Sequence, residues 1–322
     1  MRLRPLPRTS LIVTNLCLDA SAFGRLVDAR TSFSVLDRFC ARGGNLLQVD
    51  ADELVRASGR AETVVGAWLR SRAVERNELV IASRVVLPAR GGMRGSMVQH
   101  LGEAFDELRR GLRVDQIDLG LCAMPDIRLP LGELLDAMAE LVASQRVRHV
   151  GLCGFQGWRV RDAVACAATG SLPRITAVQS DYSIHRAEPF ESDLSRVCRA
   201  SDVAFLARAG MASGESAEAW CRLSPHRSGL DALEQIAARR GEDREQTELA
   251  WILGHPGVTS VVVRAGSADE LEPFLEAAAN PLSADERAQI RAERIAAVRA
   301  SDSATSGCLS LQLTTNGGLP HD

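Results

Sequence analysis

The stretch Gly43–Glu53, which reads GGNLLQVDADE, decides the fold of this chain. Its apolar run Asn45–Val49 follows two glycines of the kind that end helices, and a polar loop comes directly after it. A second stretch, Gly59–Gly66 (GRAETVVG), then opens a helix at Glu62. A strand, a loop and a helix in this order are the unit from which parallel α/β sheets are built.

The same unit recurs along most of the chain. Apolar runs separated by amphipathic segments are typical of a parallel sheet covered by helices, and eight units predict a closed α/β structure, the (β/α)8 TIM barrel. We expect one barrel domain over residues 1–300 and a flexible tail over residues 301–322, which is rich in Ser, Thr and Gly. The predicted strands are 11–15, 45–49, 78–84, 116–122, 147–152, 175–179, 203–207 and 259–264. The predicted helices are 32–42, 61–72, 97–112, 131–144, 158–168, 192–200, 230–240, 245–253, 268–279 and 283–299.

Composition excludes several classes of function. The chain has 322 residues, of which 46% are hydrophobic and 25% charged, and its net charge of −3 leaves no basic footprint for nucleic acid. No apolar run approaches membrane-spanning length and no signal peptide is evident, so we expect a soluble cytoplasmic protein with no membrane partner. The sequence leaves open whether the protein forms a homodimer. The eight cysteines are scattered without a Cys-x-x-Cys pair, which predicts free thiols and no metal site.

The chain contains no lysine and a single tyrosine, Tyr182. All 38 residues counted as Lys or Arg are therefore arginines. Without a side-chain amine, catalysis through a Schiff base, as in lysine aldolases or lysine-bound pyridoxal phosphate, is excluded.

Motifs spread in order over residues 11–300 resemble those of the aldo-keto reductases. The opening stretch is similar to the family's G-x-N-F-I-D-T-A-x-x-Y-G, and Arg76–Arg84 is similar to R-x-x-V-I-A-T-K. Leu112–Asp126, Val147–Phe155 and Val178–Ser183 are similar to the family's L-x-x-D-Y-I-D-L-Y-L-L-H-x-P-D, I-R-x-I-G-V-S-N-F and V-Q-x-E-Y-S. The resemblance implies the same barrel fold.

Family members reduce carbonyls with NADPH, using a Tyr proton donor that is tuned by a Lys, a His and an Asp. On this resemblance the four positions fall on Glu53, Arg84, Ala123 and Gln48. None keeps the family residue, and a Tyr–Lys pair cannot form in a chain without lysine.

The cofactor positions depart from the family as well. Gln179 is kept, but the family's Ser-Asn pair matches Cys153 and Gly154, and the cation expected for a 2′-phosphate is absent at Gly266, with Arg264 two residues away. The aromatic residue that stacks on the nicotinamide matches Phe205. We therefore expect no cofactor and count NADPH binding as disfavoured, because function belongs to sites and fold alone does not carry it.

Residues that follow barrel strands face the active site in this fold. They predict a rebuilt polar centre, in which Glu53 acts as acid or base, Arg84 fixes charge and Gln48 provides hydrogen bonds. Three alternative interpretations stay open. Asp50 could belong to a solvated acidic loop, Arg84 could simply pair with a carboxylate, and Trp158 and Phe205 could only pack between barrel and helices. The candidate catalytic residues are Gln48, Glu53 and Arg84, and the candidate substrate-binding residues are Asp50, Met124, Trp158, Tyr182, Phe205 and Arg208.

The sequence thus favours a non-redox, cofactor-independent enzyme on this scaffold. Its substrate would be an apolar, polyketide-like intermediate that undergoes cyclisation, a pericyclic step or dehydration, with the pocket providing orientation and the three polar residues polarisation. Two alternatives stay open. One is a non-catalytic binding or regulatory protein of the same fold, and the other is an atypical NADPH-dependent oxidoreductase.

Overall fold

A computed structural model describes residues 1–50, 61–88, 95–124, 126–169, 172–209 and 231–296. Glu53, predicted to be catalytic, and the predicted tail 301–322 lie outside these ranges. Within the described ranges, no helix combines the length and apolar character needed to cross a membrane.

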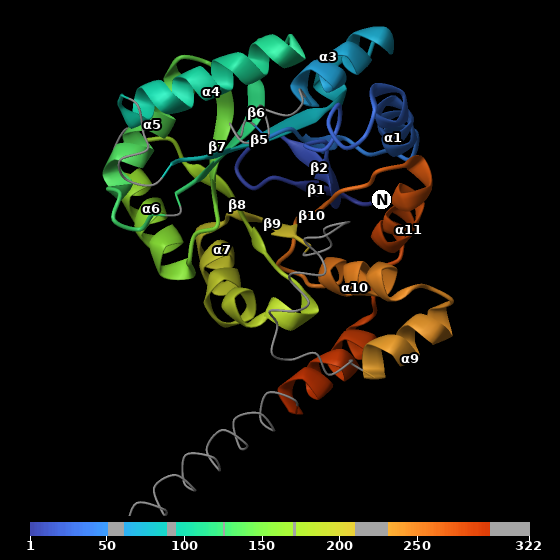
Figure 1. The fold of residues 1–322 in the computed structure, drawn as a ribbon. Coiled ribbons are helices and arrows are strands. Elements are labelled where there is room, and N and C mark those ends of the chain that lie inside the picture. Colours follow the sequence, from blue (N-terminus) through green and yellow to red (C-terminus); the bar gives the residue numbers. More distant parts are fainter. Residues whose placement is uncertain (51–60, 89–94, 125, 170–171, 210–230, 297–322) are drawn as a thin grey trace, which may run out of the picture.

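Eight strands form a closed barrel with helices around it (Figure 1). Every strand pairs in parallel with both neighbours, in the ring order β10-β3-β4-β5-β6-β7-β8-β9. This confirms the predicted (β/α)8 barrel. The strands are β3 (Leu16–Asp19), β4 (Leu46–Gln48), β5 (Val80–Val86), β6 (Ile117–Ala123), β7 (Val147–Cys153), β8 (Ile175–Asp181), β9 (Ala204–Arg208) and β10 (Ser260–Val263).

Helices follow the strands as the periodicity predicts. Several begin at a side chain that accepts a backbone N–H of the first turn, as at Asp28, Ser96, Asp243 and Ser267. The helices are α1 (Ala29–Ala41), α3 (Ala61–Ser71), α4 (Met97–Leu112), α5 (Leu131–Ala143), α6 (Gly157–Thr169), α7 (Ser195–Ser201), α9 (Asp231–Arg240), α10 (Arg244–Leu253) and α11 (Ala268–Ala279). Residues 284–296 are also helical, and short turns occupy η1 (Arg76–Glu78), η2 (Ile184–Arg186) and the π-helical η3 (Phe190–Leu194).

The start of the chain corrects one prediction. The run at 11–15 was expected to be the first barrel strand, but β2 (Ile12–Thr14) pairs antiparallel with β1 (Leu3–Pro5) in a separate hairpin. The first barrel strand is β3. Leu6, Leu11 and Val13 of the hairpin segment belong to the same buried cluster as Cys17 and Leu46 of the barrel interior, so the hairpin is held by apolar packing against the barrel.

Two apolar clusters show which way the strand residues point. The smaller cluster contains alternate residues such as Leu119, Leu121, Ala204 and Leu206, whereas the larger one contains Phe205 and the buried faces of the helices. Side chains of a strand alternate between its two faces. Ala204, Leu206 and Arg208 therefore face the barrel interior, and Phe205 faces the surrounding helices.

Candidate functional site

Three of the predicted residues meet at the C-terminal ends of β4 and β5. Gln48 and Asp50 are 1% and 2% exposed. The Asp50 carboxylate accepts the Arg84 Nη2 at 2.6 Å and the Gln48 Nε2 at 2.8 Å. Residues 48 and 50 lie two apart, which puts them on one face of an extended segment, and neighbouring-strand pairing brings Arg84 beside them.

A fourth group joins from the opposite wall of the barrel. Gln179 of β8 is fully buried, and its Nε2 donates to the Gln48 Oε1 at 2.6 Å. The Cys153 thiol of β7 lies 3.5 Å from the Gln179 Oε1. We call Gln48, Asp50, Arg84, Cys153 and Gln179 the polar floor, because they form one hydrogen-bonded chain across the interior at the mouth.

Burial and charge act against each other in the polar floor. Burial raises the pKa of Asp50, and the Arg84 guanidinium opposes that shift. For Arg84 burial is the largest single cause and would lower the pKa, but the Asp50 carboxylate and the other acidic groups around it together raise the pKa, so Arg84 stays charged. Burial also raises the pKa of the Cys153 thiol, although Arg84 and Arg208 oppose the shift. Cys153 is therefore a neutral thiol and a poor nucleophile.

Two more ion pairs stand around the mouth. Arg264, directly after β10, donates to Asp19 of β3 at 2.9 Å. Arg208 of β9 donates to Asp181 of β8 at 2.7 Å. With Asp50–Arg84, each pair links neighbouring strands, and the ends of β6 and β7 carry Ala123 and Cys153 instead. The mouth therefore has a charged arc and an arc of small, weakly polar side chains.

Buried donors without partners occur in this charged arc. Within the described part of the chain, the Nε of Arg84 and the Nε of Arg264 are buried and make no hydrogen bond. Buried N–H groups are nearly always paired in proteins. An oxygen atom of a bound molecule would satisfy these two donors.

The other predicted substrate-binding residues are distributed differently. Met124 follows β6, is 5% exposed and packs in the larger cluster on the helix side, whereas Arg208 faces the mouth. Trp158, at the start of α6, is 47% exposed and donates its indole N–H to the Gln156 Oε1 at 2.6 Å.

Tyr182 and Phe205 differ from expectation. Both side chains are fully buried on the helix side of the barrel wall. Tyr182 packs against Phe190, Trp251 and His255, and Phe205 stacks on Phe190 with 3.9 Å between ring centroids. We call these five residues the aromatic cluster. Burial and the nearby Glu191 raise the pKa of Tyr182, which makes it a weaker acid.

Sequence reasoning did not assign Asp19 or Asp181 a catalytic or binding role, and it did not assign one to Cys153 either. Asp19 escaped notice because the first barrel strand was placed at 11–15; with β3 at Leu16–Asp19, its place at a strand end would have selected it. Gln179 was noted only as a kept position of the resemblance, and its bond to Gln48 has no signal in the sequence. No group of His, Cys, Asp and Glu in the described ranges could hold a metal ion.

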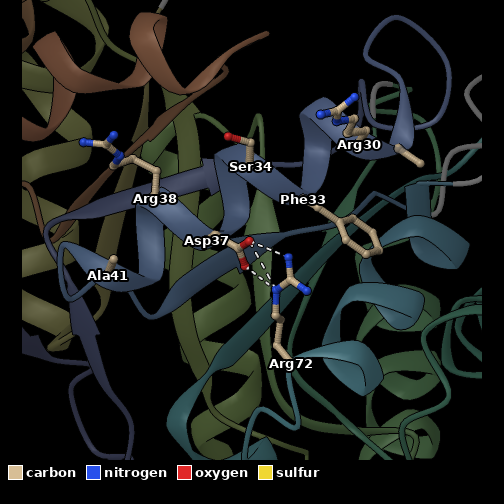
Figure 2. Close-up of a pocket in the computed structure, with 8 residues that line it drawn as sticks. Arg30, Phe33, Ser34, Asp37, Arg38, Ala41 and Arg72 are labelled. Atoms are coloured by element: carbon tan, nitrogen blue, oxygen red, sulfur yellow. Dashed lines mark hydrogen bonds and ion pairs between the residues drawn. The ribbon is translucent and has the colours of Figure 1, made fainter.

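A separate surface groove of about 630 Å³ lies along α1. In it, Arg72 forms a bidentate pair with Asp37 and lies 5.7 Å from the centroid of the Phe33 ring (Figure 2). The side chains of Arg30 and Arg38 lie far apart in this view. Because its charges do not converge and it lies on the outer helical layer, the barrel mouth is the better candidate site.

Comparison with known proteins agrees with this architecture. The sequence profile described as "Aldo/keto reductase family" matches residues 16–294. The chain belongs to the aldo/keto reductase family. It is 24% identical to "Uncharacterized oxidoreductase YrpG" of Bacillus subtilis, over 84% of this chain and 89% of that protein. It is 26% identical to "Protein tas" of Escherichia coli, over 91% and 97% of the two chains.

A fungal family member is similar over much of its length as well. "Norsolorinic acid reductase stcV" of Emericella nidulans is 25% identical, over 87% of this chain and 78% of that protein. The named relatives thus include oxidoreductases. These relatives favour the alternative of an oxidoreductase over the predicted cofactor-independent cyclase. Neither cyclisation nor independence from a cofactor finds support among them.

Proposed function

We propose that this aldo/keto reductase family member is an atypical oxidoreductase that acts on a carbonyl group of an apolar, polyketide-like compound. The observation that carries the proposal is the Arg84 guanidinium. It is anchored by Asp50, and its Nε is a buried donor without a partner among the described residues. A cation fixed in this way polarises a carbonyl oxygen and stabilises negative charge that develops on it.

A nicotinamide nucleotide is the cofactor that the family implies, and the chain fits it at two points. Gln179 offers a buried carboxamide at the floor of the mouth. Arg264, with its unpartnered Nε, directly follows the last barrel strand and lies just before α11, and such barrels often bind phosphate there. At Gly266 the backbone N–H is taken by the Glu270 carboxylate at 2.8 Å, which disfavours an additional phosphate group at that position.

The nucleotide, when bound, supplies the hydride. The chain's own residues orient and polarise the substrate: Arg84 donates to the carbonyl oxygen, and Asp50 holds Arg84 in place. The apolar body of the substrate would lie against the arc formed by Ala123 and Cys153 and would exclude water from the mouth. The acid role falls to Glu53, as predicted from the sequence, because the only tyrosine is buried in the aromatic cluster and no lysine exists.

The second candidate is the cofactor-independent conversion predicted from the sequence. One observation favours it: Phe205, the expected stacking partner of a nicotinamide, is turned to the helices. In this case the same substrate class would bind the mouth, and Arg84 would stabilise an enolate during cyclisation or loss of water.

Both candidates are tested by incubating the protein with norsolorinic acid, the compound in the name of the fungal relative, with and without NADH or NADPH. The products are analysed by mass spectrometry, and nucleotide oxidation is followed by absorbance. Nucleotide-dependent gain of two hydrogens supports the oxidoreductase, whereas loss of water or an isomeric product without nucleotide supports the second candidate. Arg84→Met should lower turnover about a hundredfold, and Arg8→Met, at a half-exposed surface pair, should not change it. Equal turnover by Arg84→Met and the wild type would contradict the proposed role of Arg84.

A further inference from the structure

Two buried glutamines join opposite walls of the barrel. Gln48 on β4 and Gln179 on β8 lie four strands apart in either direction around the ring, and their amides meet at 2.6 Å. Both residues are at most 1% exposed. The interior of an eight-stranded barrel is just wide enough for side chains to fill. Their contact, which we call the amide bridge, therefore closes the centre of the floor.

The direction of the amide bridge follows from Asp50. A carboxylate only accepts hydrogen bonds, so Gln48 must turn its NH2 group to Asp50 and its oxygen to Gln179. Gln179 then presents its NH2 to Gln48 and its oxygen to the Cys153 thiol. Both ends of the Gln179 carboxamide are consequently engaged by the protein itself.

We infer that the amide bridge competes with a carboxamide-bearing guest, so that Gln48 sets how tightly the barrel binds a nicotinamide nucleotide. The inference rests on the proposed oxidoreductase function. A guest carboxamide competes with Gln48 for Gln179, because the two amides offer the same donor and acceptor and Gln48 already occupies the inward-facing N–H of Gln179. When the guest replaces Gln48, one hydrogen bond forms and one breaks, so the number of hydrogen bonds does not rise. The affinity for the nucleotide is therefore lower than in a barrel with a free Gln179, by about the free energy of the broken bond.

The test measures NADH and NADPH binding by isothermal titration calorimetry on the full chain. Gln48→Asn shortens the side chain by one methylene, so it no longer reaches across the barrel but keeps its polarity. We expect it to bind the nucleotide about tenfold more tightly than the wild type. Gln99→Asn is the matched control, since Gln99 is exposed on α4 and its side-chain amide donates to Glu103 far from the barrel mouth, and it should leave the dissociation constant unchanged.

A double variant separates competition from a mere increase in space. In Gln48→Asn/Gln179→Ala the gain should disappear, because the carboxamide partner is gone; a gain that persists would overturn the inference. Circular dichroism and the thermal midpoint check folding. Gln48→Met, which keeps the length and volume of the side chain, replaces Gln48→Asn if that variant does not fold, with the same expected gain.

The remaining outcomes distinguish the two proposals. Equal, measurable affinities of the wild type and Gln48→Asn would overturn the competition and leave the oxidoreductase standing. No nucleotide binding by the wild type or by any Gln48 variant would overturn both.

Discussion

The polar floor and the aromatic cluster lie on opposite sides of the same barrel wall. Gln179 of the floor and Tyr182 of the cluster are three residues apart, and Phe205 of the cluster lies between the inward-facing Ala204 and Leu206. The floor has ionic and amide hydrogen bonds inside the barrel, whereas the cluster has stacked rings between barrel and helices. The difference teaches that the polar side chains of this barrel are gathered at its centre, while its aromatic side chains pack in the outer layer.

The largest effect is expected from removing the anion of the floor. Asp50→Ala leaves the Arg84 guanidinium, 19% exposed, without its partner. Breaking a buried pair from one side costs about 3 kcal/mol of unfolding free energy. Urea denaturation measures the loss.

Two controls sharpen this prediction. Asp50→Ala/Arg84→Met removes both charges and should recover most of the stability, because apolar groups can replace a buried pair at little cost. Asp202→Ala breaks the pair with Arg8, in which both side chains are 51% exposed, and should cost about 1 kcal/mol or less. Equal losses for Asp50→Ala and Asp202→Ala would show that the floor behaves like the surface.

The aromatic cluster should respond to acid. Burial, assisted by Arg287, lowers the pKa of His255 to about 4, and its Nδ1 accepts the Gly257 N–H at 3.0 Å. The pKa of His255 is lower in the folded protein than the ordinary value near 6.5, so the unfolded chain binds a proton more readily. The contribution of His255 to stability is therefore fully present above pH 6.5 and is lost as the pH falls towards 4.

His255→Gln removes the titration and should flatten this part of the curve. Because His255 is partly exposed, we expect the wild type to lose about 1–2 kcal/mol through this group between pH 6.5 and pH 4. Urea denaturation at several pH values measures it. Parallel curves for the two proteins would contradict a lowered pKa of His255 in the folded protein.

The fold was predictable because its signal is repeated. Eight apolar runs separated by amphipathic helices specify a parallel barrel even when one run is misassigned, as 11–15 was. The hairpin β1–β2 was missed because a short apolar run does not reveal whether its partner is parallel or antiparallel. The position of Asp19 at the mouth was lost with that assignment.

The site was predictable only as far as strand ends define it. Gln48, Asp50 and Arg84 follow directly from their places at the ends of two neighbouring strands. Whether a strand side chain faces the barrel interior or the helices is harder to predict, because a shift of one residue turns it from one face to the other. Phe205 was matched to a mouth position by the family resemblance, but in the structure it faces the helices. The bond between Gln48 and Gln179 depends on the barrel diameter, which no local pattern encodes.

The smallest effect is expected at the only tyrosine, and it bears most directly on which region holds the chemistry. Tyr182→Phe keeps the ring contacts with Phe190 and Trp251 and removes only the hydroxyl that donates to the Glu191 Oε1 at 3.0 Å. The free energy of unfolding should fall by about 0.5–1.5 kcal/mol. Glu191 keeps a partner in Arg294 at 3.3 Å, which limits the loss. Substrate turnover should not change, because the hydroxyl lies on the helix side of the wall. A large loss of turnover at unchanged stability would instead assign the proton donor to Tyr182, and the aromatic cluster would then belong to the active site.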